Sequence, residues 1–508
     1  MFLDFNFFKM KQQITILLLF CLALSSCTKD FQSTNTDPNN TPDALPQQLL
    51  PPALVNTLNY NMMRNRNFNN ELMQVTVNMS DAEGQPFRYD IPNSYSDYLY
   101  NGWYSQLTNF KDIYKISSGE LNLNKSYMGI SLVCQSWIYS MLTDTYGSIP
   151  YFHSNQAKDS ANYQPAFDAQ KDIYMDIFKQ LETANSLLSA NTAIVAASDP
   201  VYNGNIGRWR KFGNSLYLRL LLRLSGKAEV SDTCIKKFQA IVGNQASYPL
   251  IDSNAESAIL RWTGIAPYTS PYLSVREQDF RTPAIASFFI DHLAAWNDPR
   301  IDIPTYGTGG FNRWDIAPYS GQYLGIPSGY APGANLTKKS YFYSTSSAAT
   351  LMTEPLTGMM LNAAEVQFML AEAAAKGWIA GPAETYYDSA ASASIKLWLP
   401  NWSLNIKDFL AAADIQWDEG ASLDDKMEKI HLLKYYALFL EDLQEWFEYR
   451  RTGHPVLPKG PGLKNGGVMP ARMAYPVYVQ STNPTNYKAA VAAQGPDLIS
   501  TQVWWQKP

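Results

Sequence analysis

The sequence predicts a mainly α-helical protein with tetratricopeptide-like helical hairpins, a loop-rich face and a few short strands. Long segments carry apolar residues at helical spacing, and Gly, Asn or Pro separates one segment from the next. Alternating patterns are few and short, at 257–262 and 475–479. No strict repeat is visible, so the prediction of hairpins depends on the pattern of paired helical segments with short turns alone.

Residues 1–26 predict a lipoprotein signal peptide. Lys9 and Lys11 precede an apolar run at 14–24, which is too short to cross a bilayer permanently. The run ends in a small residue followed by Cys27, an arrangement that resembles the cleavage signal of bacterial lipoproteins. We therefore expect Cys27 to become the lipidated N-terminus; an ordinary signal peptide with a chance cysteine is the alternative.

Residues 27–47 predict a flexible tether, because Asn, Thr, Asp and Pro dominate and no apolar period appears. Such a tether spans on the order of 25 Å. The remaining residues, 48–508, are expected to form a single domain with a large core.

Composition argues against several classes of function. The formal net charge is −5, with 17% charged residues and no long basic block, so nucleic acid is not an expected partner. No phosphate-binding glycine loop, HExxH pattern or metal-ligand cysteine spacing occurs, so we expect no cofactor and no metal. Cys134 and Cys234 lie in apolar contexts and are expected to be buried thiols, with a single disulfide as the alternative.

The helices are predicted in chain order. Asn362 and Gly377 are expected to cap and stop the helix at 362–377, which turns back into an antiparallel partner. The other clear helical segments are 127–144, 169–189, 207–226 and 383–399.

A last helix is predicted from about 425 to 451, rich in acids. Glu441, Glu445 and Glu448 share one face, and Arg451 can pair with Glu448 near the C-terminal end. This pattern favours a structural role. The alternative is a secreted glycoside hydrolase that uses an acid pair such as Glu441 and Glu445.

Five segments distributed along the chain carry a resemblance to a family. They are 434–457, 142–151, 282–301, 365–378 and 469–505. Together they resemble SusD/RagB nutrient-binding outer-membrane lipoproteins, in a divergent SusD-like branch. The resemblance implies four tetratricopeptide-like hairpins, no catalysis, and a SusC-type TonB-dependent transporter barrel over which the lipoprotein closes as a lid.

Two loop regions, 81–104 and 304–330, mix aromatic rings with Asn, Asp and Arg. Sugars present flat C–H faces edged with hydroxyls, which aromatic rings can meet. The cargo is expected to be a glycan, with an oligopeptide as the alternative. We expect Trp314→Ala to abolish binding without lowering the melting temperature; the opposing hypothesis is that the rings pin the loops or contact the barrel. The candidate ligand residues are Phe87, Tyr89, Asn93, Tyr95, Tyr306, Asn312, Trp314, Tyr319 and Tyr323, with Trp262 and Tyr268 as weaker ones.

Overall fold

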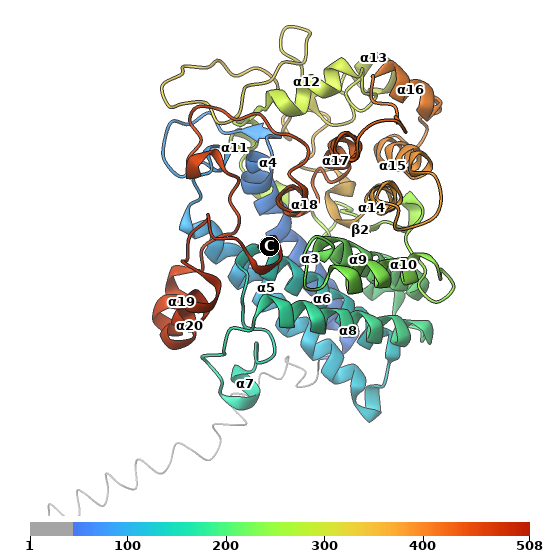
Figure 1. The fold of residues 1–508 in the computed structure, drawn as a ribbon, viewed down its shortest axis with the longest axis vertical. Coiled ribbons are helices and arrows are strands. Elements are labelled where there is room, and N and C mark those ends of the chain that lie inside the picture. Colours follow the sequence, from blue (N-terminus) through green and yellow to red (C-terminus); the bar gives the residue numbers. More distant parts are fainter. Residues whose placement is uncertain (1–43, 508) are drawn as a thin grey trace, which may run out of the picture. The chain divides into compact units, whose positions relative to one another are not determined.

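A computed structural model of the protein describes residues 44–507 (Figure 1). The signal peptide, Cys27 and almost all of the expected tether lie outside the described residues. Among residues 44–507, no helix combines the length and hydropathy that a membrane span requires.

Helical hairpins dominate the chain, as the sequence predicts. Four pairs of helices pack against each other, and α17 (Leu423–Ala437) packs on both helices of the last pair. Figure 1 shows the pairs following one another from the blue to the orange part of the chain. The pairs are α3 (Pro46–Arg64) with α5 (Asn93–Ser118), α6 (Lys125–Tyr146) with α8 (Gln170–Ser189), α9 (Ile206–Leu224) with α10 (Ser231–Val242), and α14 (Ala363–Ala375) with α15 (Ala383–Trp398).

Local sequence signals explain these helices. The side chain of Asn362 accepts a hydrogen bond from the backbone N–H of Glu365 at 3.0 Å, which satisfies a free donor of the first turn of α14. Gly377 follows the helix with a φ of 71°, a conformation that glycine adopts without strain. Between α6 and α8, a Cβ at Gly129 would lie 2.6 Å from Leu188 Cγ, so glycine permits the close approach of the two helices.

The expected continuous helix from 425 to 451 is wrong. The chain leaves the helix after α17, turns at Leu440 and Asp442, which both have positive φ, and resumes as α18 (Gln444–Thr452). A side chain from another part of the fold holds the turn, because Asn65 donates to the Asp442 carbonyl at 2.8 Å.

The expected strand at 475–479 is also wrong. Pro476 precedes the short helix α19 (Val477–Thr482), which packs on α20 (Pro484–Gln494). Proline suits this place because its ring fixes φ and the first helical turn needs no N–H from it.

Between residues 44 and 507 the strands form three antiparallel pairs. β4 (Ile316–Ala317) pairs with β5 (Tyr341–Phe342) and fixes the end of the 304–315 segment. The other pairs are β1 (Thr76–Val77) with β3 (Ala284–Ile285) and β2 (Ala258–Leu260) with β6 (Gly358–Leu361). β2 is the strand expected at 257–262. The remaining short helices are α4 (Asn70–Leu72), α7 (Ala157–Ser160), α11 (Glu277–Arg281), α12 (Ser287–Ala295), α13 (Ile303–Tyr306) and α16 (Ile406–Ala412).

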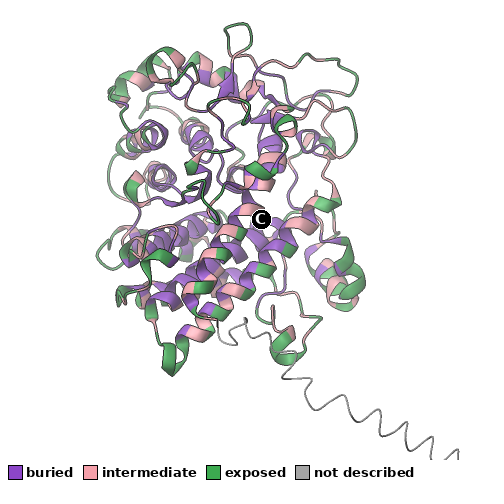
Figure 2. Cartoon of the chain, turned by 180° about the vertical axis from the view of Figure 1, so that it is seen from behind, coloured by how far each residue is buried: buried purple, intermediate pink, exposed green. Residues whose placement is uncertain are grey.

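The core runs through all the hairpins. Figure 2 shows buried residues along the inward helix faces, with exposed residues on loops and outer helix surfaces. Cys134 and Cys234 are free and buried in this core, which confirms the expected buried thiols. Burial raises the pKa of the Cys234 thiol to about 12, so it stays protonated and unreactive at neutral pH.

Candidate ligand-binding site

The acid-rich stretch around α18 is a buried ion-pair network, not an open site. Arg219 of α9 lies between Glu365 of α14 and Glu441, and its Nε donates to Glu365 Oε1 at 2.7 Å. Asn362 donates to the second oxygen of Glu441 at 2.9 Å. All three charged side chains are buried, so the network ties three separated segments together.

The hydrolase alternative lacks a cleft. Glu445 receives a hydrogen bond from Asn69 at 2.7 Å, and burial raises its pKa to about 8. The cavity beside it has a volume of about 10 Å³, room for no more than one water molecule. No sugar ring can reach Glu441 or Glu445 in this arrangement.

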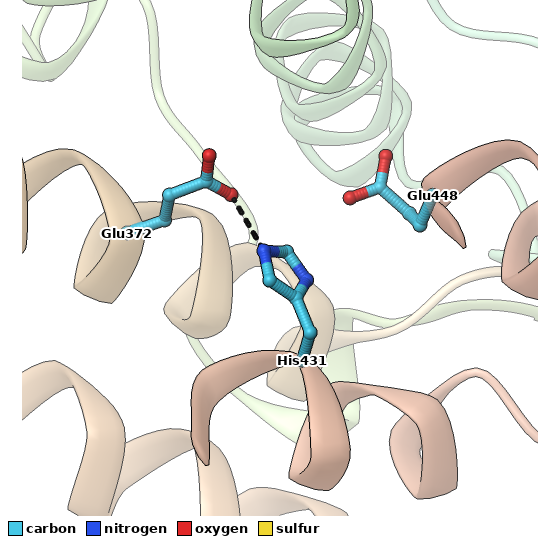
Figure 3. Close-up of side chains that lie close together, drawn as sticks. All are labelled: Glu372, His431 and Glu448. Atoms are coloured by element: carbon cyan, nitrogen blue, oxygen red, sulfur yellow. Dashed lines mark ion pairs between the residues drawn. The ribbon is translucent and has the colours of Figure 1, made fainter. Parts of the chain in front are cut away.

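Glu372, His431 and Glu448 converge next to this network from α14, α17 and α18 (Figure 3). One ligand atom from each lies within 4.8 Å of the others, which makes the cluster a candidate metal site. Cations of the protein already hold both carboxylates: Arg451 contacts Glu372 at 2.6 Å, and Lys434 contacts Glu448 at 2.7 Å.

Electrostatics supports a structural role for this cluster. Although burial opposes ionisation, Arg451 holds the pKa values of Glu372 and Glu448 well below their usual range. His431 is buried, which lowers its pKa and favours the neutral ring. A metal ion would have to displace Arg451 from both carboxylates, so this donor set fits an internal ion-pair network better than a metal.

Four of the nine predicted ligand residues are almost fully buried. Phe87 and Trp314 are 0% exposed, Asn312 2% and Tyr89 3%. Trp314 stacks on Phe289 with ring centroids 5.7 Å apart, and the Arg300 guanidinium lies over its ring at 4.3 Å. The expectation that Trp314 offers its ring to a ligand is therefore corrected, and its loss should reduce stability. Of the weaker candidates, Trp262 is buried and Tyr268 partly exposed.

The two predicted loop regions meet each other. Phe87 stacks on Tyr330 with centroids 5.2 Å apart, and Arg88 Nε donates to the Tyr330 carbonyl at 3.0 Å. Tyr323 receives a hydrogen bond from Asn312 and donates to the Ile301 carbonyl, both at 2.7 Å. These side chains pin long loops to the body.

The remaining predicted residues are more accessible but scattered. Asn93 opens α5 and is exposed, whereas Tyr95 lies under the guanidinium of Arg64 at 4.3 Å. Tyr319 is 42% exposed in a tight turn. Tyr306 is partly exposed and lines a hollow.

That hollow is the candidate ligand-binding site and has a volume of about 260 Å³. It adjoins a second hollow of about 450 Å³ that shares Arg313, Glu354 and Pro355 with it. We call the first one the Asp315 hollow. Its lining residues are Tyr306, Thr308, Phe311, Asn312, Arg313, Asp315, Ala349, Thr350, Thr353, Glu354 and Pro355.

Sequence reasoning found only part of this hollow. Tyr306 and Asn312 were predicted as ligand residues, and both line it; Phe311, Arg313 and Asp315 belong to the predicted loop region 304–330. Thr350, Thr353 and Glu354 come from a segment without an aromatic cluster or motif, so the sequence carries no signal for them.

Asp315 distinguishes the Asp315 hollow from its surroundings. Asp315 is 4% exposed and lines the hollow, yet no hydrogen bond or ion pair reaches its carboxylate from any residue in the range 44–507. Burial raises the pKa of Asp315 to about 7; nearby Arg313 opposes this rise and Glu354 adds to it. The hollow therefore contains a hydrogen-bonding group that the protein leaves unused.

Arg313 and Glu354 form the charged wall of the hollow. Arg313 Nη1 contacts Glu354 Oε2 at 2.7 Å, and Arg313 Nε donates to the Trp398 carbonyl at 2.8 Å. Phe311 packs edge-on against Tyr343 with centroids 4.9 Å apart, which fixes an aromatic side chain beside these charges. The hollow can thus combine ring contact with directed hydrogen bonds.

A larger hollow of about 530 Å³ lies elsewhere, lined by residues of α5, α6 and α8. Apart from the exposed Asp112, its charged groups have protein partners. Lys111 donates to the Ser154 carbonyl at 3.0 Å, and Asp176 accepts from the Tyr151 hydroxyl at 2.8 Å. We name it the Lys111 hollow.

The fold and the hollow define a helical-hairpin protein whose loops form a small polar and aromatic site. A family described as starch-binding and associating with the outer membrane matches residues 38–476. The chain belongs to this SusD-like family.

Solved structures agree on the fold. A SusD homologue from Bacteroides uniformis has a TM-score of 0.75 and 23% identity, covering 91% of this chain and 99% of that one. A chitin-binding SusD homologue from Flavobacterium johnsoniae has a TM-score of 0.74 and 20% identity, covering 91% and 98%. A SusD homologue from Bacteroides fragilis has a TM-score of 0.72 and 23% identity, covering 91% and 99%. Among curated proteins, none matches the chain significantly.

Proposed function

We propose that this protein is a cell-surface lipoprotein that binds an oligosaccharide and delivers it, as a lid, to a SusC-type TonB-dependent outer-membrane transporter. Membership of the SusD-like family supports the nutrient-binding role and the association with the outer membrane. The chitin-binding homologue supports a glycan as the cargo. The acids that a hydrolase would use are enclosed in the core, which supports binding without catalysis.

The observation that carries the choice of site is the unused Asp315 carboxylate beside aromatic side chains. Tyr306 and Phe311 line the same hollow as Asp315, Thr350 and Thr353. Sugar hydroxyls can donate to the carboxylate while the C–H face meets a ring. The adjoining hollow gives an oligomer room to continue.

Titration calorimetry on the detergent-extracted full protein tests this assignment, with starch and chitin oligosaccharides and a set of short peptides as ligands. We expect binding of an oligosaccharide, and a loss of about fivefold or more in affinity in Phe311→Ala, since an aromatic–sugar contact is worth about 1 kcal/mol or more. Phe152→Ala is the matched control, because Phe152 is 46% exposed and lines the Lys111 hollow. Equal affinities in both variants would remove the site from the Asp315 hollow.

The anchor and the partner need separate tests. Labelled fatty acid should enter the wild-type chain and not a Cys27→Ser variant, because the thiol carries one of the acyl chains. The wild-type protein should copurify from outer membranes with a large TonB-dependent barrel. Absence of label, or purification without any barrel, would contradict the delivery role.

Oligopeptide cargo is the second candidate. The Asp315 carboxylate in the hollow suits the amine at the N-terminus of a short peptide as well as it suits a sugar hydroxyl. Binding of peptides alone in the calorimetric series would select this alternative.

A further inference from the structure

We propose that the Asp315 hollow selects an amino-sugar oligomer through a free primary amine that pairs with the Asp315 carboxylate. This proposal rests on the proposed function, because it names the class of glycan that the same site takes. It goes beyond the family and the homologues, because starch and chitin, the glycans named for them, are neutral.

The backbone holds Asp315 in a fixed position. Its N–H donates to the Asn312 carbonyl at 3.2 Å, and its carbonyl accepts from the N–H of Tyr343 at 2.9 Å. The residue has a φ of 54°, a conformation that asparagine and aspartate tolerate better than most other residues. The backbone that carries the carboxylate is thus fixed before a ligand arrives, which lowers the entropic cost of binding.

The charges around the hollow leave one carboxylate uncompensated. Arg313 lies against Glu354 at 2.7 Å, so the positive charge of the guanidinium is balanced within that pair. Glu354 Oε1 also accepts from the N–H of Leu356 at 3.1 Å, which holds the pair in place. Asp315 remains as an acidic group without an ionic partner among the charged residues that line the hollow.

The Asp315 carboxylate has no protein donor among residues 44–507, and a ligand that donates to it forms a hydrogen bond to a charged group, which is worth more than one between neutral groups. A primary amine suits this acceptor better than an amide, because its hydrogen bond to a carboxylate is charge-assisted. Since burial places the pKa of Asp315 at about 7, the carboxyl and an amine can share a proton near neutral pH.

Acetylation of the amine gives a matched pair of ligands for the test. Titration calorimetry near neutral pH would compare a glucosamine tetramer with the same tetramer fully N-acetylated, on the full protein. We expect the free amine to bind about tenfold or more tightly, as a charge-assisted hydrogen bond predicts. Equal binding of the two tetramers, or tighter binding of the acetylated one, would overturn the proposal.

Asp315→Asn is the decisive variant, because asparagine keeps the shape and the positive φ but cannot carry the charge. Its preference for the amine should fall to a ratio near one, while its thermal unfolding stays close to wild type. Asp112→Asn is the control, since Asp112 is an exposed carboxylate that lines the Lys111 hollow. A preference that survives in Asp315→Asn, or that disappears in Asp112→Asn, would overturn the assignment to Asp315.

A peptide arm identifies the source of the amine. Short peptide amides with a free or an acetylated N-terminus would be titrated in the same way. Tighter binding of the free peptide than of either tetramer would overturn the amino-sugar class. If the acetylated and free tetramers bind equally well, glycan binding stands and only the amine preference fails; if no glycan binds, the proposed function fails as well.

Discussion

The network around α18 and the Asp315 hollow both contain arginine and acidic side chains. The acids of the network have protein partners, whereas Asp315 has none in the described part of the chain. Around α18, Glu441 is held by Arg219 and Asn362, and Glu448 by Lys434 and Arg451. In the hollow, the carboxylate of Asp315 faces open space without a protein partner among residues 44–507. The acids around α18 therefore support the fold, whereas Asp315 is available for the ligand in the function we propose.

The largest expected effect comes from breaking the network. Arg219→Met leaves Glu365 and Glu441 buried without their shared cation, which should lower the free energy of unfolding by about 3–5 kcal/mol. Urea denaturation would measure this loss. Arg210→Met on the same helix is the control, because Arg210 is only partly buried and its loss should cost about 1 kcal/mol. Similar losses in the two variants would show that the network is not a support.

The next effect distinguishes the structural role of Trp314 from the binding role proposed for its neighbour Asp315. Trp314→Ala should lower the free energy of unfolding by about 3–5 kcal/mol, because the ring is fully buried against Phe289 and Arg300. Thermal unfolding would show a clearly reduced melting temperature. A variant that melts like wild type but no longer binds sugar would restore Trp314 as a ligand residue.

A third effect depends on pH. Glu445 has a pKa of about 8 in the folded protein against an ordinary value of 4.5, so the folded protein keeps a proton that the unfolded chain releases. Stability therefore falls as pH rises through this window. Glu445→Gln cannot lose a proton, so its stability relative to wild type should improve between about pH 5 and about pH 8.

Urea midpoints at both ends of that range would measure the change. Glu71 has a similarly raised pKa of about 8, so the variant should remove only part of the pH dependence. Glu120→Gln, at an exposed position, should keep the wild-type dependence. Parallel curves for wild type and Glu445→Gln would mean that Glu445 is ionised in the folded protein.

Much of the fold could be predicted from the sequence, because local signals determine it. The cap at Asn362, the stop at Gly377 and the following antiparallel helix all occur as expected. The break after α17 could not be predicted, because its apolar pattern continues through the turn. A distant partner, Asn65, holds that turn.

The site was predicted less well, for a physical reason. A tryptophan in a loop rich in Gly and Pro suggests an exposed ring, but Phe289 and Arg300 from other segments cover Trp314. The lack of a donor to the Asp315 carboxylate among residues 44–507 also depends on the tertiary structure, because it results from how other segments pack around this residue. Sequence spacing carries no information on that absence.

A crystal structure of the protein in complex with an oligosaccharide tests the central claim most directly. The account predicts ordered sugar in the Asp315 hollow, with a donor within hydrogen-bonding distance of the Asp315 carboxylate and a ring near Phe311. Sugar bound in the Lys111 hollow, or an opened core with sugar at Glu441 and Glu445, would contradict it.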